Sequence, residues 1–435
     1  MFSAIARVFK TPDLRRKLLF TLGIIAIYRL GVYIPAPGVD YTAVRQCMQL
    51  GNTTGGLYDF VNMFSGGALL QVSILAMGIM PYITASIIIQ LLRVVVPHFE
   101  ELHKDGAAGQ TKLTQYTRYL TIALGLLQAT TLVTMAQSGQ LFGNCQYPVF
   151  PNSSIWTIVL VIVVLTAGTL LIMWLGELIT EKGVGNGMSL LIFTSIAAGF
   201  PGSMFSILQS KGWGIFAVVL LVILVILGAV VFVEQSQRRI PVQYAKRMIG
   251  RRTVGGTSTY IPIKVNMANV IPVIFASSLL ALPLMVVQFA QKGDGTMPDW
   301  AAWISAHLAS TSSPLHVLLY VLLVFGFTYF YVSITFNPTE VADDMKKYGG
   351  FVPGIRAGEP TAKYLGYVSS RITFAGAIYL SVVAVIPVVA LSLLNANQNI
   401  PFGGTSIIIL VGVGLETVKQ INAQMQQRHY EGLLR

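Results

Sequence analysis

The stretch GIFAVVLLVILVILGAVVFV, residues 214–233, decides the fold class of this chain. It holds 20 consecutive residues without a charge, the length that an α-helix needs to cross the hydrocarbon core of a bilayer. The whole chain of 435 residues is similar in character, with 54% hydrophobic and 11% charged residues and a mean hydropathy of +0.68. Soluble proteins average about 25% charged residues. The composition therefore excludes soluble globular and disordered proteins, and it indicates an all-α membrane protein.

Other long apolar runs are bounded by charged residues, Pro, Gly or Asn, which predicts ten transmembrane helices in all. The predicted spans are residues 18–36, 72–96, 119–138, 155–176, 187–205, 214–233, 268–290, 315–336, 372–394 and 403–420. The apolar run 57–70 is too short to cross, so we expect a re-entrant segment or a half-helix in the core.

Basic residues set the orientation, because 24 of the 29 Lys and Arg lie in the two terminal tails and in the connections after the even-numbered spans. The positive-inside rule then places both termini in the cytoplasm. Ten spans divide into two halves of five, which we place at 1–213 and 214–435. An odd number of spans per half gives the halves opposite orientations, which permits an inverted repeat with a functional path between the halves.

The spans hold almost no buried charge, and this argues against ion-coupled transporters and proton pumps. Arg29 and Arg93 lie near span ends, where we expect their side chains to snorkel. The sequence has no Walker, HExxH or GxSxG motif. We therefore predict no catalytic residues, no metal site and no cofactor. From the residues alone, a solute transporter with inverted repeats is the leading interpretation.

Several long stretches resemble SecY, the large channel subunit of the bacterial Sec protein translocase, and they occur in that family's order. They are NMFSGGAL (62–69), GIMPYITASIIIQLL (78–92), MWLGELITEKGVGNGMS (173–189), QRRIPVQYAKRMIGRR (237–252), IPIKVNMANVIPVIFASS (261–278), FNPTEVADDMKKYGGFVPGIRAGEPTAKYL (336–365) and PFGGTS (401–406). With this resemblance a protein-conducting channel replaces the transporter as our first hypothesis.

The resemblance implies ten helices in two inverted halves around a central hourglass pore, with a plug helix in the outer funnel and a lateral gate toward lipid. It implies a protein-conducting channel in the bacterial cytoplasmic membrane that passes unfolded secretory polypeptides. The implied partners are SecE, SecG, SecA, the ribosome with its RNA, signal peptides, nascent chains, membrane lipids and an accessory membrane insertase.

A ring of apolar side chains is implied at the narrowest point of the pore. The family's positions fall on Ile79, Ile83, Ile192, Ile274 and Ile409. Ile offers no hydrogen bond to water or ions, so an empty ring can seal by dewetting. By composition alone these residues would simply face lipid or neighbouring helices. Ile407 and Ile408 stay open as alternatives to Ile409.

The plug is implied at about 57–70, and its assigned residues are Phe60, Asn62, Met63, Phe64, Ser65, Gly66 and Gly67. The two glycines form a flexible joint; a static re-entrant hairpin is the alternative. Lateral-gate residues are implied among polar, uncharged side chains of the second and seventh spans, namely Thr84, Ser86, Gln90 and Asn269. The alternative for these four is ordinary packing between helices.

Two cytoplasmic segments, about 234–265 and 337–371, are long for connectors. The first has seven basic residues against one acidic residue, and the second has five against four. Attraction to anionic lipid would explain their charge but not their length. The resemblance implies docking of SecA and the ribosome there, because arginine suits phosphate groups. The assigned residues are Arg238, Arg239, Arg247, Arg251, Arg252 and Arg356.

The two cysteines have no role implied by the resemblance. Cys47 and Cys145 both fall on the outer side in the predicted topology. A bond between them would limit the movement of the plug, and two unrelated thiols are the alternative.

Overall fold

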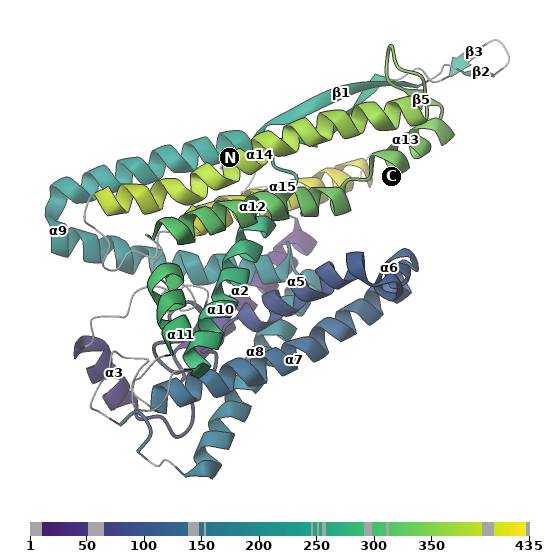
Figure 1. The fold of residues 1–435 in the computed structure, drawn as a ribbon. Helices are drawn as coiled ribbons and strands as arrows, with labels where there is room; N and C mark the ends of the chain where they lie inside the picture. Colours follow the sequence, from purple (N-terminus) through teal and green to yellow (C-terminus); the bar gives the residue numbers. More distant parts are fainter. Residues whose placement is uncertain are drawn as a thin grey trace.

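The computed structural model describes residues 11–50, 65–137, 148–151, 154–244, 247–249, 252–254, 258–290, 298–309, 313–393 and 404–431. Long helices dominate these residues, and Figure 1 shows α5, α7 and α8 in one group and α12, α14 and α15 in another, with α10 between them. The predominantly helical fold predicted from the sequence is confirmed.

The first group contains predicted spans and also shorter helices that lie outside the predicted membrane. Its elements are α2 (Pro12–Val32), α3 (Tyr41–Leu50), α5 (Met80–Val95), α6 (Pro97–Lys104), α7 (Ala107–Gln137) and α8 (Ile155–Lys182). α9 (Gly187–Gln235) joins the two groups, because it contacts both α8 and α15. α9 carries two predicted spans, because a non-helical residue, Gly212 with φ 78° and ψ 177°, divides it.

The second group follows after a small β region. Its elements are α10 (Ile271–Ala290), α11 (Asp299–Ile304), the π-helix η2 (Ser305–Ala309), α12 (Pro314–Thr335), α13 (Pro338–Lys347), α14 (Glu359–Leu393) and α15 (Gly404–Glu431). α14 and α15 extend beyond the predicted spans 372–394 and 403–420 by several helical turns toward the predicted cytoplasmic side.

Within the described residues, seven helical segments are long and apolar enough to cross a membrane, or eight if the bent pair α5 and α6 counts as one span. The two helices of this pair meet at 98°, where Pro97 begins α6. A multi-pass membrane protein is therefore established, and the number ten stays a prediction.

The second span differs from its prediction in structure and not only in length. We expected a helix over 72–96, but α5 begins only at Met80, and residues 66–79 form turns. Val72 and Gly78 have φ of 46° and 56°, which a right-handed helix does not allow. Apolar composition was a poor guide here, because backbone groups of this segment find partners outside a helix: Ile74 N donates to Ile34 O, and Val72 O accepts from Ala36 N.

The long basic segments are folded as well, which the sequence analysis did not anticipate. β1 (Gln237–Tyr244) pairs antiparallel with β4 (Ser258–Lys264), with Ile240 opposite Ile261, and β5 (Gly350–Phe351) adds to the free edge of β1. A smaller pair, β2 (Arg247–Ile249) and β3 (Arg252–Val254), extends the hairpin. Buried Ile240, Val242 and Ile263 share a hydrophobic cluster with Leu365 of α14, so the two segments form one structure.

Candidate functional site

One apolar cluster lies where the two helix groups meet. It draws buried side chains from α2, α5, α8, α9, α10, α12, α14 and α15. All five isoleucines assigned to the ring belong to this cluster, four as buried members and Ile274 as a partly buried neighbour. The structure thus brings together residues from four separate parts of the chain, although their role as a pore ring stays a prediction.

Ile79 and Ile83 occupy one turn at the start of α5. Ile79 is the N-cap residue with right-handed helical φ and ψ, and the Ile83 amide donates to its carbonyl oxygen over 3.1 Å. Pro81 fixes the start of the helix, since it needs no amide partner in the first turn. The two side chains therefore lie one turn apart, at the point where irregular chain becomes helix.

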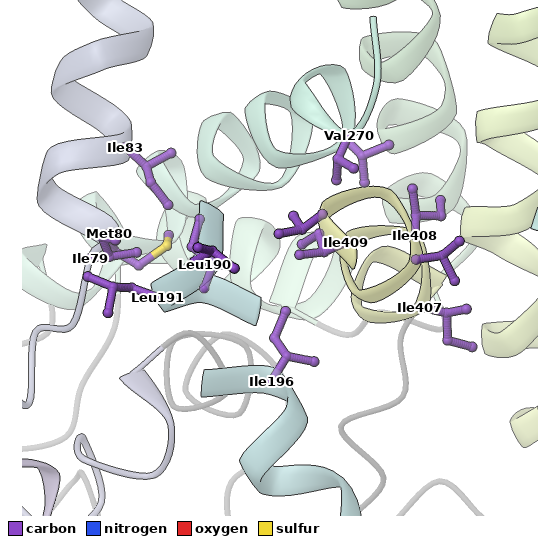
Figure 2. Close-up of a cluster of buried hydrophobic side chains, with 14 of the residues drawn as sticks. Ile79, Met80, Ile83, Leu190, Leu191, Ile196, Val270, Ile407, Ile408 and Ile409 are labelled. Carbon is purple, nitrogen blue, oxygen red and sulfur yellow. The ribbon is translucent and has the colours of Figure 1, made fainter. Parts of the chain in front are cut away.

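Figure 2 bears on the choice between Ile409 and its neighbours. Ile409 lies on the side of α15 that faces Leu190 and Ile83, whereas Ile407 points to the opposite side. Both are almost fully buried, so burial alone does not separate them. All three isoleucines belong to the cluster, and the direction of its side chain favours Ile409 as the ring residue of α15.

The plug assignment falls largely outside the described residues, since Phe60, Asn62, Met63 and Phe64 are not among them. Ser65, Gly66 and Gly67 are described. Both glycines have positive φ, 67° and 93°, which glycine adopts without a steric penalty. The conformational freedom expected of this joint is therefore used in the structure.

The chain that follows the plug, residues 68–79, is firmly held. Ala36 N donates to Val72 O over 3.0 Å, and Ile74 N donates to Ile34 O over 2.9 Å, which ties the segment to the end of α2. A Cβ added to Gly168 of α8 would overlap the Ile74 carbonyl oxygen. Close approach of two backbones explains why glycine is needed there.

The lateral-gate assignment maps to a seam between two helix pairs. α5 packs on α7, α10 packs on α12, and α5 also contacts α10. Thr84 is buried and donates to Met80 O over 3.0 Å, while Gln90 Nε2 lies 3.4 Å from Ser86 Oγ. These polar groups have partners within α5, and their role at a lateral gate stays a prediction.

Near the start of α10 lies a buried carboxylate that the sequence analysis did not single out. Glu234 of α9 is buried, and its Oε1 accepts a 2.6 Å hydrogen bond from Asn266 Nδ2. The same amide nitrogen lies 3.1 Å from the Asn269 carbonyl oxygen, and Asn269 has a positive φ of 53°. This arrangement fixes the entry into α10. No sequence spacing signals it, because the two side chains are 32 residues apart.

Two of the arginines assigned to docking have described, exposed side chains on β1. Arg238 and Arg239 project from the hairpin, and the Arg239 guanidinium lies 4.9 Å from the centre of the Tyr260 ring. Arg356 is exposed in the turn between β5 and α14, where its carbonyl oxygen accepts from Thr361 Oγ1 over 2.9 Å. Arg247 and Arg252 lie in β2 and β3, and Arg251 is outside the described residues.

In the described part of the chain, no group of three or more His, Cys, Asp or Glu residues could hold a metal ion. The expectation that the protein uses no metal or cofactor remains a prediction.

The structure describes one of the two cysteines. Cys47 of α3 is buried and disulfide-bonded. The only other cysteine in the sequence is Cys145, which is outside the described residues. Cys47 shares a hydrophobic cluster with Leu69 and Val72, so α3 packs against the segment that follows the plug.

Thiol labelling of the purified protein after denaturation, with and without reductant, tests this bond. We expect no labelling without reductant and two labelled cysteines with it, because the sequence offers Cys47 no other partner within the chain. A bond between Cys47 and Cys145 would close a loop of roughly 100 residues, which the chain-entropy model gives about 4–5 kcal/mol of stabilisation. Reduction should therefore also lower the thermal unfolding midpoint. Equal labelling in both conditions would show two free thiols.

Comparisons with known proteins agree with this geometry. A family model described as SecY matches residues 73–418. The protein translocase subunit SecY of Micrococcus luteus is 62% identical over 437 residues, which cover 100% of both chains. A solved SecY structure, described by its plug domain that stabilises the closed state and maintains a membrane seal, has a TM-score of 0.63 at 19% identity, covering 94% of this chain and 92% of that one. Sec61 in the canine ribosome-channel complex has a TM-score of 0.61 at 18% identity, with the same coverage. At these identities the two structures support the fold alone.

Proposed function

The chain belongs to the SecY family of protein translocase subunits, and from this premise we propose how it moves polypeptides. As a translocase subunit it is a multi-pass membrane protein and not an enzyme. It passes unfolded secretory polypeptides across the bacterial cytoplasmic membrane through a path between halves 1–213 and 214–435. It also releases transmembrane segments sideways into lipid. Both termini lie in the cytoplasm, an orientation supported by the distribution of basic residues.

The apolar ring explains how one channel can serve many substrates. An extended polypeptide presents varied side chains, and a ring of Ile side chains demands no specific polar partner from any of them. The same surface offers no hydrogen bonds to water, so the ring closes by dewetting when it is empty. The observation that carries this proposal is the convergence of Ile79, Ile83, Ile192 and Ile409, buried, in one cluster between the helix groups.

Transmembrane segments leave the channel through the seam between the helix pairs α5–α7 and α10–α12. The pairs α5–α7 and α10–α12 move apart as two bodies, because each pair has its own packing. Thr84 and Ser86 keep partners within α5 when the seam opens. A signal peptide helix that enters the open seam contacts lipid on one side and the pore on the other.

Reconstitution tests the proposal directly. Purified channel complex in liposomes, with added SecA, ATP and a secretory precursor, should protect the precursor from external protease, and liposomes without the channel should not. Uptake of small solutes without precursor protection would instead favour the inverted-repeat transporter.

Docking of the driving partners is assigned to the folded cytoplasmic region. β2, β3 and β5 lie at the end of the molecule toward which α13 and α14 extend (Figure 1). Arginine on a hairpin suits the phosphates of ribosomal RNA. SecA would use the same region, and SecE and SecG would complete the channel in the membrane.

Arg356→Glu should strongly reduce SecA-driven translocation and leave the folded complex intact. The side chain is exposed, so charge reversal costs little stability but repels an acidic partner surface. Precursor protection in vesicles measures the effect. Lys112→Glu is the matched control, because Lys112 is exposed on α7 outside both cytoplasmic segments. Undiminished translocation with Arg356→Glu would remove this residue from the docking site.

A further inference from the structure

A short helical segment, α11 continued by η2, connects the long helices α10 and α12. Figure 1 shows α11 beside α10, on the opposite side of the molecule from β2 and β3. Residues 300–309 of this segment carry no Asp, Glu, Lys or Arg. The distribution of basic residues places it on the outer side of the membrane. Because it is too short to cross a bilayer, its exposed face meets either water or the membrane surface.

One face of the segment packs on the two neighbouring helices. Ala301 is fully buried. Leu308 and Ile304 share a small hydrophobic cluster with Leu280 of α10 and Leu319 of α12. The three packed residues of the segment follow each other at spacings of three and four, which places them on one helix face. The segment is therefore joined to α10 and α12 and does not hang free as a loop.

Hydrogen bonds fasten η2 to the first turn of α12. His316 Nδ1 lies 2.7 Å from the Leu308 carbonyl oxygen, and Ser313 Oγ donates to the His307 carbonyl oxygen. His307 Nδ1 lies 2.9 Å from the Trp303 carbonyl oxygen, and the rings of His307 and Trp303 stack with their centroids 4.7 Å apart. A carbonyl oxygen only accepts, so both histidines donate from Nδ1. These contacts fix the side chain of Trp303.

The neighbouring face of the segment exposes two indole rings. Trp300 is 48% exposed and Trp303 is 54% exposed, although tryptophan is on average largely buried in globular proteins. Each precedes a packed residue by one position, which is about 100° around a helix. The exposed face thus lies beside the packed face and not opposite to it. An indole has an apolar body and one N–H donor, which suits the layer where hydrocarbon meets polar headgroups.

Other tryptophans of the chain occupy equivalent places. Trp156 lies in the first turn of α8 and is 80% exposed, and Trp213 follows the kink at Gly212 of α9 and is 75% exposed. Both lie at ends of spans that the charge pattern places on the outer side. Four of the five tryptophans are therefore exposed on this side. Tryptophan is enriched at the headgroup level of membrane proteins, so these positions indicate one such level.

The lipid-facing surface of the spans continues into the exposed face. Leu318 of α12 is exposed and lies two residues after His316, which binds η2. Val286 of α10 is also exposed, on the other helix that packs on the segment. In a multi-pass protein such apolar side chains contact lipid. An uncharged aromatic face that borders them meets the same membrane.

We propose that α11 and η2 form an interfacial anchor, in which the face of Trp300 and Trp303 lies in the headgroup layer of the outer leaflet and holds the outer ends of α10 and α12 at a fixed depth. The partner is the phospholipid surface, recognised by indole N–H groups and ring contact. Binding is independent of lipid charge, because residues 300–309 carry none. This inference goes beyond the proposed function, since it depends on membrane insertion and not on the passage of a polypeptide.

Spin-label depth tests the anchor. Ala302→Cys and Ala306→Cys place labels at exposed positions without removing a tryptophan. In the complete complex in liposomes, label collisions with oxygen and with a water-soluble nickel chelate report depth. We expect both labels within about 5–10 Å of the boundary between headgroups and acyl chains. The result should be the same in zwitterionic liposomes and in liposomes with added anionic lipid.

Two further positions calibrate the measurement. Leu322→Cys, on the exposed side of α12, should report hydrocarbon, and Tyr348→Cys, after α13 on the predicted cytoplasmic side, should report water. The parent protein, treated with the same label, supplies the background from its two native cysteines.

Replacing the two tryptophans tests what holds the segment in place. Trp300→Ser combined with Trp303→Ser should move the Ala306→Cys label toward water by at least about 5 Å, because the apolar face that enters the membrane is lost. Trp174→Ser is the matched control, since Trp174 is also exposed but lies in α8. It should leave the label depth unchanged.

Labels at Ala302→Cys and Ala306→Cys that behave like the water control would overturn the anchor. Labels shielded from oxygen and nickel alike would also overturn it, because they would show that a protein chain covers this face. An unchanged depth after the paired Trp→Ser replacement would show that the tryptophans hold nothing. The proposed function fails differently, since precursor protection can be absent while the labels stay at the boundary.

Discussion

Exchanging Ile79 for Asn should make the resting channel conduct ions. Ile79 is 2% exposed at the N-cap of α5, and Figure 2 shows it beside Leu191 of α9. An amide at this point gives water two hydrogen-bonding groups inside an otherwise apolar constriction, which removes the barrier that dewetting provides. We expect a rise in resting planar-bilayer conductance of at least about tenfold, because the seal depends on the absence of such groups.

Two controls separate wetting from loss of stability. Ile79→Val keeps the surface apolar and costs only about 1 kcal/mol, so its resting conductance should match that of the parent. Ile407→Asn introduces the same amide at a buried position on the other side of α15, and it should lower stability with less leak than Ile409→Asn. Parent-like conductance of Ile79→Asn would show that this cluster is core packing and not a constriction.

Deleting residues 60–67 should leave a channel that inserts, folds and translocates, but that leaks at rest and exports precursors with defective signal sequences. The deletion removes the assigned plug together with the partners of Tyr28 and Arg29 at Ser65 and Gly66. It spares the segment that is bonded to the end of α2. Export of a signal-defective precursor should rise from near zero to a readily measured fraction.

A neighbouring deletion provides the contrast. Removing residues 68–75 eliminates buried Ala68, Leu69, Val72 and Leu75 and the backbone hydrogen bonds to Ala36 and Ile34. Burial of several such side chains contributes roughly 1.5–3 kcal/mol each, so this variant should fail to accumulate in the membrane. If deletion of 60–67 were equally destructive, the region would be a structural hairpin and not a movable plug.

The sequence predicted those features that depend on local composition. Long uncharged runs such as 155–176 and 315–336 correspond to α8 and α12, because an apolar helix is the favoured way to cross lipid. The isoleucines of the cluster could be assigned only through the family resemblance. In a chain this rich in Ile, composition alone does not tell which isoleucines face lipid and which pack in the core.

Other features depend on partners far away in the sequence. Residues 66–79 are as apolar as a span but form turns, because contacts with α2 and α8 replace regular hydrogen bonding. In the β1–β4 hairpin, buried and exposed residues alternate over only a few positions among charged residues, so the sequence analysis did not identify the strands. Tyr28, Ser65 and Ser195 are each ordinary in their own segments, and only folding brings them together.

Photo-cross-linking tests the central claim, that polypeptides pass through the isoleucine ring. A photoreactive residue at Ile79 or Ile274 should cross-link to a secretory chain stalled during translocation, with a matched probe at Leu279. Leu279 lies on the exposed face of the same helix as Ile274 and should contact lipid. We predict cross-links to the stalled chain from both ring positions and few from Leu279. Cross-links from Leu279 as strong as those from Ile274, or none from either ring position while the chain reaches the far side, would contradict the account.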